Sequence, residues 1–157
     1  MADYDLRSNL KQVPLLVPAV WDADNTPTAV DLGAFRSALI NIHVGVGGIT
    51  FTTSNKVEFT LTHGDTNVYA DSVAVTSDEV VMPYGETFVT GGILRTLNAA
   101  KAAADTELSG YGYIGKKRYI FLLANFSGTH SSGTPMAAHA TLGNPHSSPL
   151  WQSDIEE

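Results

Sequence analysis

The residues best suited to chemistry are five histidines, because a neutral imidazole is a common metal ligand and a proton acceptor near neutral pH. His130, His139 and His146 follow one another near the end of the chain. None forms an H-x-x-x-H or H-x-H pair with a nearby carboxylate, the arrangement typical of a metal site. We therefore expect isolated surface or edge-strand histidines there, satisfied structural histidines at His43 and His63, and no bound metal.

The sequence offers no recognisable nucleophile. It contains no cysteine, and the G-x-S-x-G elbow of serine hydrolases does not occur. Asp22, Asp24 and Asn25 come nearest to a calcium loop, but the full D-x-D-x-D-G pattern is missing, which favours a solvated Asx turn. We expect no catalytic residue, no cofactor and no enzymatic activity.

Glycines at positions 110, 112 and 115 satisfy G-x-G-x-x-G, and Lys116 follows them as in a phosphate-binding loop. In such loops the glycines open onto a helix whose N-terminal amides bind the phosphate. Here they open onto an aromatic and branched run, which favours a strand. We therefore reject a nucleotide site and interpret Lys116, Lys117 and Arg118 as a solvated strand end.

Length and charge narrow the class of protein further. A chain of 157 residues fits a single domain. The first residues lack the basic and apolar regions of a signal peptide, and the longest apolar runs are too short to span a bilayer, so we expect synthesis in a cytoplasm and no membrane partner. The formal net charge of −7 disfavours nucleic-acid binding.

Several segments alternate apolar and polar residues as strands do. We expect residues 112–128 to form a central strand covered on both faces. Because of its two prolines, the segment 13–20 should be an edge strand or an extended crossover, and residues 56–63 should form a hairpin with residues 68–75. Val57, Phe59 and Leu61 should face inward. Residues 98–105 alone have helix propensity. The pattern predicts an all-β antiparallel sandwich, with a jelly roll or related Greek key as its topology.

The expected domain spans residues 13–142, with an N-terminal arm at 1–12 and a C-terminal arm at 143–157. The arms have too few periodic apolar groups to fold independently. Leu150 and Trp151 are costly to leave in water, and the glycine-rich loop at 47–55 carries Ile49 and Phe51. We take Leu150, Trp151, Ile49, Phe51 and Tyr84 as the candidate partner contacts.

The order of several segments resembles a known family. The segments are VDL at 30–32, ALI at 38–40, VGVGGITF at 44–51, KVEFTLTH at 56–63, YIGKKRY at 113–119, GTH at 128–130 and GTP at 133–135. Together they look like the small auxiliary capsid proteins of tailed bacteriophages, which are also called decoration or cement proteins. The likeness spans roughly residues 30–149.

The resemblance implies a structural virion protein without catalysis that binds the major capsid protein on the outside of the phage head and stabilises the shell. It also implies a homo-oligomer, a dimer or trimer, and either a jelly-roll or a tulip-like β fold. The alternative is a carbohydrate-binding or receptor-binding module of a phage fibre. That function needs a row of exposed aromatic side chains, for which the candidates are Tyr69, Tyr84, Tyr111, Tyr113 and Trp151.

Overall fold

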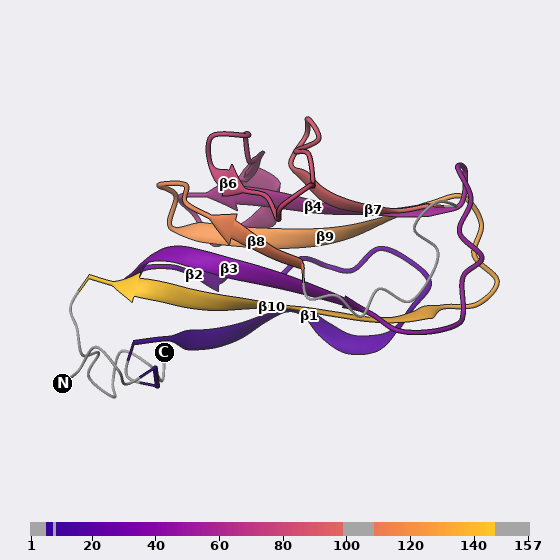
Figure 1. The fold of residues 1–157 in the computed structure, drawn as a ribbon, viewed down its shortest axis with the longest axis horizontal. Coiled ribbons are helices and arrows are strands. Elements are labelled where there is room, and N and C mark those ends of the chain that lie inside the picture. The colour runs from indigo at the N-terminus through magenta and orange to yellow at the C-terminus, as the bar shows by residue number, and fades with distance from the viewer. Residues whose placement is uncertain (1–5, 8, 99–108, 147–157) are drawn as a thin grey trace.

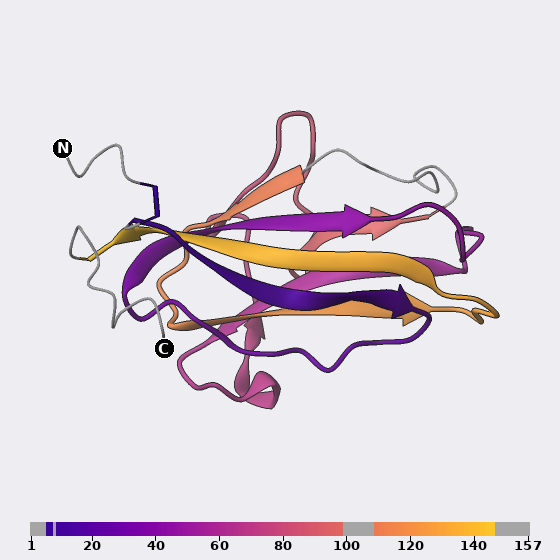
Figure 2. The ribbon, with the colours of Figure 1, turned by 90° about the horizontal axis from the view of Figure 1, so that it is seen from below.

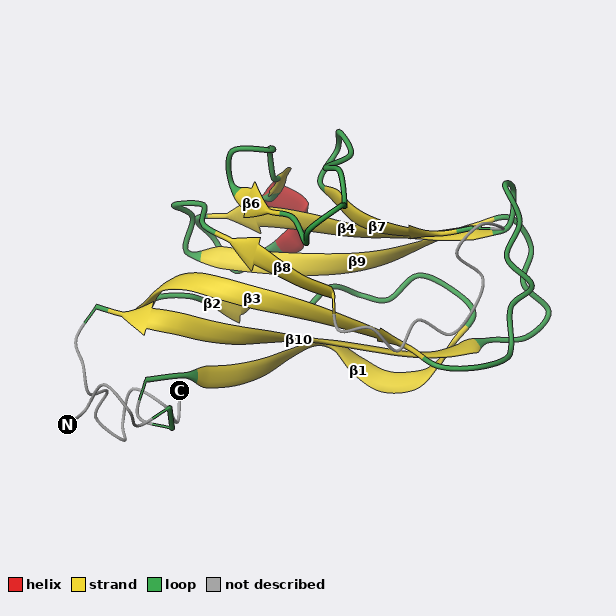
Figure 3. Cartoon of the chain, in the orientation of Figure 1, coloured by secondary structure: helices red, strands yellow, loops and turns green. Residues whose placement is uncertain are grey.

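The computed structural model describes residues 6–7, 9–98 and 109–146. Two antiparallel five-stranded sheets pack face to face as a β-sandwich, and Figures 1 and 3 show them as two layers. The only helical element in the described ranges is the short 3₁₀ helix η2 (Tyr69–Asp71). No helix in these ranges is long and apolar enough to cross a membrane. The antiparallel sandwich expected from the sequence is confirmed.

The first sheet has the spatial order β1, β10, β3, β8, β6. Its strands are β1 (Lys11–Trp21), β10 (Thr134–Pro145), β3 (Phe35–Val44), β8 (Ser109–Tyr113) and β6 (Val80–Val81). β1 lies at the edge, as its prolines predict, because proline cannot donate to a second partner strand. It begins two residues before the expected arm boundary, and β10 runs past the expected end of the domain.

The second sheet has the order β2, β9, β4, β5, and β7 also pairs with β4. Its strands are β2 (Val30–Asp31), β9 (Tyr119–Ser127), β4 (Lys56–Gly64), β5 (Val73–Ala74) and β7 (Ile93–Leu97). The expected hairpin after β4 is present only in part. Residues 69–71 form η2, and β5 pairs with β4 over just two residues.

The core lies between the sheets and is built from their inward-facing side chains. Val57, Phe59 and Leu61 are fully buried there, as predicted. Ile120, Leu122 and Ala124 of β9 join the same core cluster. The outer face of β9 differs from the expectation, because Leu123 is only partly buried. Phe121 is covered by Tyr69 of η2, with ring centroids 5.7 Å apart.

The glycine-rich run before β9 is a crossover between the sheets. Tyr113 ends β8 in the first sheet, and Tyr119 begins β9 in the second. A Cβ at Gly115 would lie 2.5 Å from the Tyr113 hydroxyl oxygen, so only glycine fits where the chain turns past that ring. Lys116, Lys117 and Arg118 therefore lie on the connection between β8 and β9, which passes over one end of the sandwich.

The loop after β1 is not the solvated Asx turn expected from its sequence. Asn25 is buried and pairs with the backbone of β9, donating from Nδ2 to the Leu122 carbonyl (3.1 Å) and accepting the Ala124 amide on Oδ1 (2.7 Å). Asp24 accepts the Phe126 amide (2.6 Å). The side chains of this loop thus extend the pairing of β9 beyond the short strand β2.

Candidate functional site

A buried polar cluster joins the two sheets. His63 of β4 places Nδ1 2.9 Å from the hydroxyl oxygen of Tyr113 of β8. That hydroxyl accepts the Lys117 amide (3.3 Å), so its own proton is available to His63 Nδ1, and the ring proton then lies on Nε2. Nε2 faces Glu79, whose Oε2 is 3.7 Å away. The expected structural role of His63 agrees with this geometry, although its partners lie too far away in the sequence to be identified from spacing.

Burial sets the protonation of this cluster. It lowers the pKa of His63, with Glu79 opposing the change, and it raises the pKa of Tyr113 to about 12. Near neutral pH the imidazole and the phenol are therefore both uncharged. Carboxylate, imidazole and hydroxyl lie in a row, as in a catalytic triad, but Tyr113 has no exposed surface through which a substrate would reach it. The arrangement suits a link between the sheets.

These pKa directions predict that the protein loses stability at both ends of the pH range. The pKa values of His63 and His139 lie below their ordinary value in the folded state, so the unfolded chain takes up protons more readily as the pH falls below about 6.5. The raised pKa of Tyr113 acts in the opposite direction. The unfolded chain loses that proton first, which lowers the free energy of unfolding by about 1 kcal/mol between about pH 10 and 11.

Denaturant unfolding across the pH range measures both effects. Tyr113→Phe removes the phenol, so the alkaline loss assigned to this residue should disappear even though the variant is less stable overall. Tyr84→Phe is the matched control, since Tyr84 is fully exposed, and should keep the wild-type profile. An alkaline slope that is identical in wild type and Tyr113→Phe would contradict the assignment.

A pair of histidines lies on the outer face of the first sheet. The rings of His43 and His139 stack with centroids 5.2 Å apart, and His43 Nε2 is 3.3 Å from His139 Nδ1. Asn41 Nδ2 lies 3.4 Å from His139 Nε2. The sequence suggested that His139 is isolated, and this is wrong. It meets His43 because β10 and β3 are neighbours in the sheet. Among the described residues no three His, Cys, Asp or Glu side chains form a metal-binding group.

The other two histidines lie in surface turns and hydrogen-bond locally. His130 Nε2 is 2.9 Å from the Ser127 carbonyl oxygen, and its ring packs edge-on against Phe126. His146 accepts a hydrogen bond on Nδ1 from Arg36 Nε (3.2 Å). His130 is therefore a partly buried histidine with local contacts, whereas His146 belongs to a charged pocket.

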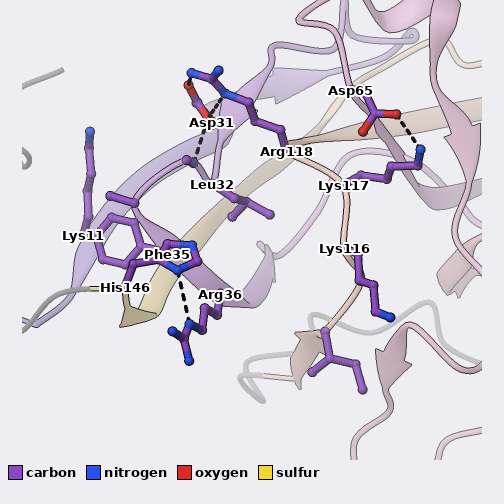
Figure 4. A pocket seen from close by; sticks show the side chains of 14 residues that line it. Lys11, Asp31, Leu32, Phe35, Arg36, Asp65, Lys116, Lys117, Arg118 and His146 are labelled. Carbon is purple, nitrogen blue, oxygen red and sulfur yellow. Dashed lines mark hydrogen bonds and ion pairs between the residues drawn. The ribbon is translucent and has the colours of Figure 1, made fainter.

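That pocket opens at one end of the sandwich and has a volume of about 800 Å³. The β2–β3 turn, the β8–β9 crossover and the ends of β1, β4 and β10 contribute to it, as Figure 4 shows. Its charged side chains are Lys11, Asp31, Arg36, Asp65, Lys116, Lys117 and Arg118, and His146 also lines it. We name it the basic pocket. The segment interpreted as a solvated strand end is therefore one wall of a pocket.

Two of the basic side chains in the wall are ion-paired. Arg118 donates from Nε and Nη2 to the two carboxylate oxygens of Asp31 (3.0 and 2.8 Å), and Lys117 Nζ lies 2.5 Å from Asp65. The hydrogen bond from Arg118 lowers the pKa of Asp31, against the effect of burial. These pairs connect the crossover to the end of β2 and to the residue that follows β4. All four side chains are substantially exposed, so each pair contributes little stability.

The structure separates the candidate partner contacts. Tyr84 is fully exposed, and Ile49 is partly buried against the core. Phe51 is 5% exposed and belongs to the core cluster, so it has almost no surface to offer a partner, because its apolar ring fills the space between the sheets. Leu150 and Trp151 lie outside the described residues, as do nearly all of residues 98–105, the segment with helix propensity.

The sequence did not reveal an apolar strip at the edge of the first sheet. Val17, Pro18, Ala19 and Val20 of β1 are all exposed, with Val17 at 56% and Val20 at 67%. Beside them runs a shallow, mostly apolar groove lined also by Gly45, His43, Pro135, Met136 and Ala137. Figure 2 shows β1 along the free edge of its sheet. The sequence signal that could have suggested it is a run of four apolar residues without alternation, in a segment whose prolines favour a sheet edge.

Comparison with known proteins gives no further identification. A scan against protein-family models, a search of curated proteins and a search of solved structures each found no match. The fold and the surface features described above are therefore the basis for assigning a function.

Proposed function

We propose that this chain is a structural virion protein that binds the outer surface of a phage head, contacts the major capsid protein and stabilises the shell without catalysing a reaction. It acts as a homo-oligomer, a dimer or trimer, at the capsid surface after synthesis in the bacterial cytoplasm. The resemblance of the sequence to decoration proteins suggests this role. The apolar strip on β1 is the structural observation that supports it.

The strip is suited to a protein partner. Burial of apolar surface is the main favourable term in protein association, and exposed apolar residues grouped along one edge are typical of an interface. β1 is also irregular, with register shifts against β10 on both sides of Leu16. Such irregularities and the prolines hinder the pairing of a further strand on this edge. The strip therefore offers side-chain contact in place of strand addition.

The carbohydrate-binding alternative has weaker support. Tyr111 and Tyr113 are fully buried, and Tyr69 packs on Phe121, so three of its five candidate aromatic residues are occupied within the fold. Tyr84 alone is an exposed aromatic among the four candidates that the structure describes. A sugar-binding platform needs several such rings on one face, so we rank this function second.

The double variant Val17→Glu/Val20→Glu tests the proposed function. Two buried charges at the interface should weaken binding to heads of the parent phage by more than about 30-fold, equivalent to about 2 kcal/mol. Both side chains point to solvent in the isolated chain, so thermal melting should be nearly unchanged. Quantitative binding to heads that lack the protein, followed by electron microscopy, measures the effect.

The matched control is Val68→Glu/Val73→Glu, which adds the same charges at exposed valines of the β4–β5 region. This control should bind heads like the wild type. Wild-type protein that fails to bind heads at all would contradict the virion role. Equal binding by wild type and Val17→Glu/Val20→Glu would show that the strip is not the contact surface.

A further inference from the structure

The positive charge of this acidic chain is concentrated at the basic pocket. Five of the nine Lys and Arg residues line it, against two of the sixteen Asp and Glu residues. The lining thus carries an excess of three positive charges, whereas the whole chain has a net charge of −7. Like charges gathered around one hollow raise the local potential, and this favours binding of an anion.

The two lining carboxylates are already engaged. Asp31 accepts both hydrogen bonds from Arg118, and Asp65 pairs with Lys117. Arg36 donates from Nε to a ring nitrogen of His146, which carries no negative charge. Lys116 is exposed and makes no hydrogen bond or ion pair within the described ranges. Arg36 and Lys116 are therefore the cations available for an additional carboxylate.

Residues 154–157 of the same chain carry carboxylates at Asp154, Glu156 and Glu157. Their three charges equal the excess positive charge of the pocket lining. The described part of the chain ends at His146, which itself lines the pocket. The eight residue steps from there to Asp154 span up to about 26–29 Å when extended, enough to return to the pocket.

We propose that the basic pocket is a carboxylate-binding site whose occupant is the acidic segment 154–157 of the same chain. Attachment through a short connection gives the segment a local concentration in the millimolar range, so weak individual ion pairs suffice to hold it. Arg36 has the planar fork that matches a carboxylate, and Lys116 supplies a point charge. A separate polyanion would have to approach against the net negative charge of the chain, whereas the connection keeps the segment close to the pocket. The site does not depend on the proposed virion function.

A single spin label tests this proposal directly. The chain has no cysteine, so Ile155→Cys provides one labelling position in the full-length protein. In ¹⁵N-labelled protein the label should broaden the backbone amide signals of residues 33–36 and 114–118, which line the pocket, more than those of η2. Lys116→Glu should reduce this broadening through roughly fivefold weaker occupancy, and Glu156→Gln/Glu157→Gln should reduce it as well.

Matched controls show whether the broadening depends on charges in the pocket or on charge changes elsewhere in the chain. Lys56→Glu changes a basic residue on β4 outside the pocket, and Asp22→Asn/Asp78→Asn removes two exposed acidic groups. Both should leave the broadening as in the parent labelled chain. Absence of broadening, or equal broadening in Lys116→Glu and Lys56→Glu, would overturn the proposal.

A mixed sample identifies the source of the segment. Protein that carries ¹⁵N but no spin label is mixed with spin-labelled protein of natural isotope content. No broadening is expected at the pocket if the segment comes from the same chain. Broadening in the mixture would show that a second copy supplies it, and the proposal of a same-chain occupant would be wrong.

Discussion

Replacing Leu122 by alanine should lower the free energy of unfolding by roughly 2–5 kcal/mol. Leu122 is 1% exposed and lies on the inward face of β9, directly opposite Leu61 of β4. The truncation removes buried apolar surface and leaves a cavity that the strands on both sides cannot close without losing their pairing. A loss at the upper end of this range is a large fraction of the stability of a typical domain.

The adjacent Leu123 provides the matched control, because it carries the same side chain on the opposite face of the same strand. It is only partly buried there. Leu123→Ala should therefore cost about 1 kcal/mol, in proportion to the smaller area removed from water. Urea unfolding of both variants measures the difference. Similar losses for the two variants would mean that the inward face of β9 is not the better packed one.

The strands that the sequence identified are those that obey a simple alternation. In β4 and β3 each apolar residue of one parity faces the core, so the period of two was sufficient to place Val57, Phe59 and Leu61. The prolines at 14 and 18 limited this segment to an edge strand or an extended crossover, and the structure has the edge strand. In both cases the signal is local, because a proline or a pleat affects its own strand and its nearest neighbour.

The run at 112–125 shows where local pattern fails. Its residues have strand propensity throughout, yet Tyr113 and Tyr119 belong to different sheets. Gly115 permits the turn between the two strands, since a Cβ there would meet the Tyr113 ring, but strand propensity does not show where such a turn divides the run. The local pattern also does not show the ion pairs of Lys117 and Arg118, because their partners Asp65 and Asp31 are far away in the sequence.

Function-related groupings were harder to predict than strands, because they depend on which strands become neighbours. His43 and His139 meet through the pairing of β3 with β10, and His63 meets Tyr113 across the two sheets. Neither pair has a spacing that a motif describes. The exposed strip at 17–20 was missed for a different reason. The prolines indicate an edge position, but the local pattern does not show which apolar side chains of the strand are covered by the rest of the fold.

Asn25→Ala should lower the free energy of unfolding by about 3 kcal/mol, because two backbone groups lose their hydrogen-bond partner. The amide of this side chain stands in for a peptide group of a neighbouring strand, because it accepts from the Ala124 amide and donates to the Leu122 carbonyl. Leu122 and Ala124 are almost completely buried, so water has little access to the two groups when the side chain is removed. Each unpaired group then costs roughly 1–3 kcal/mol.

Asp22→Ala is the control for this prediction, since Asp22 is an exposed residue at the start of the same loop. It should change the unfolding free energy by less than about 0.5 kcal/mol. Hydrogen exchange gives a second readout that cavity formation alone would not produce. The Ala124 amide should exchange much faster in Asn25→Ala than in Asp22→Ala, because its acceptor is gone, while amides of β10 in the other sheet keep the protection set by global stability. Unchanged exchange at Ala124 would mean that another acceptor serves this amide and that the loop does not complete the edge of the sheet.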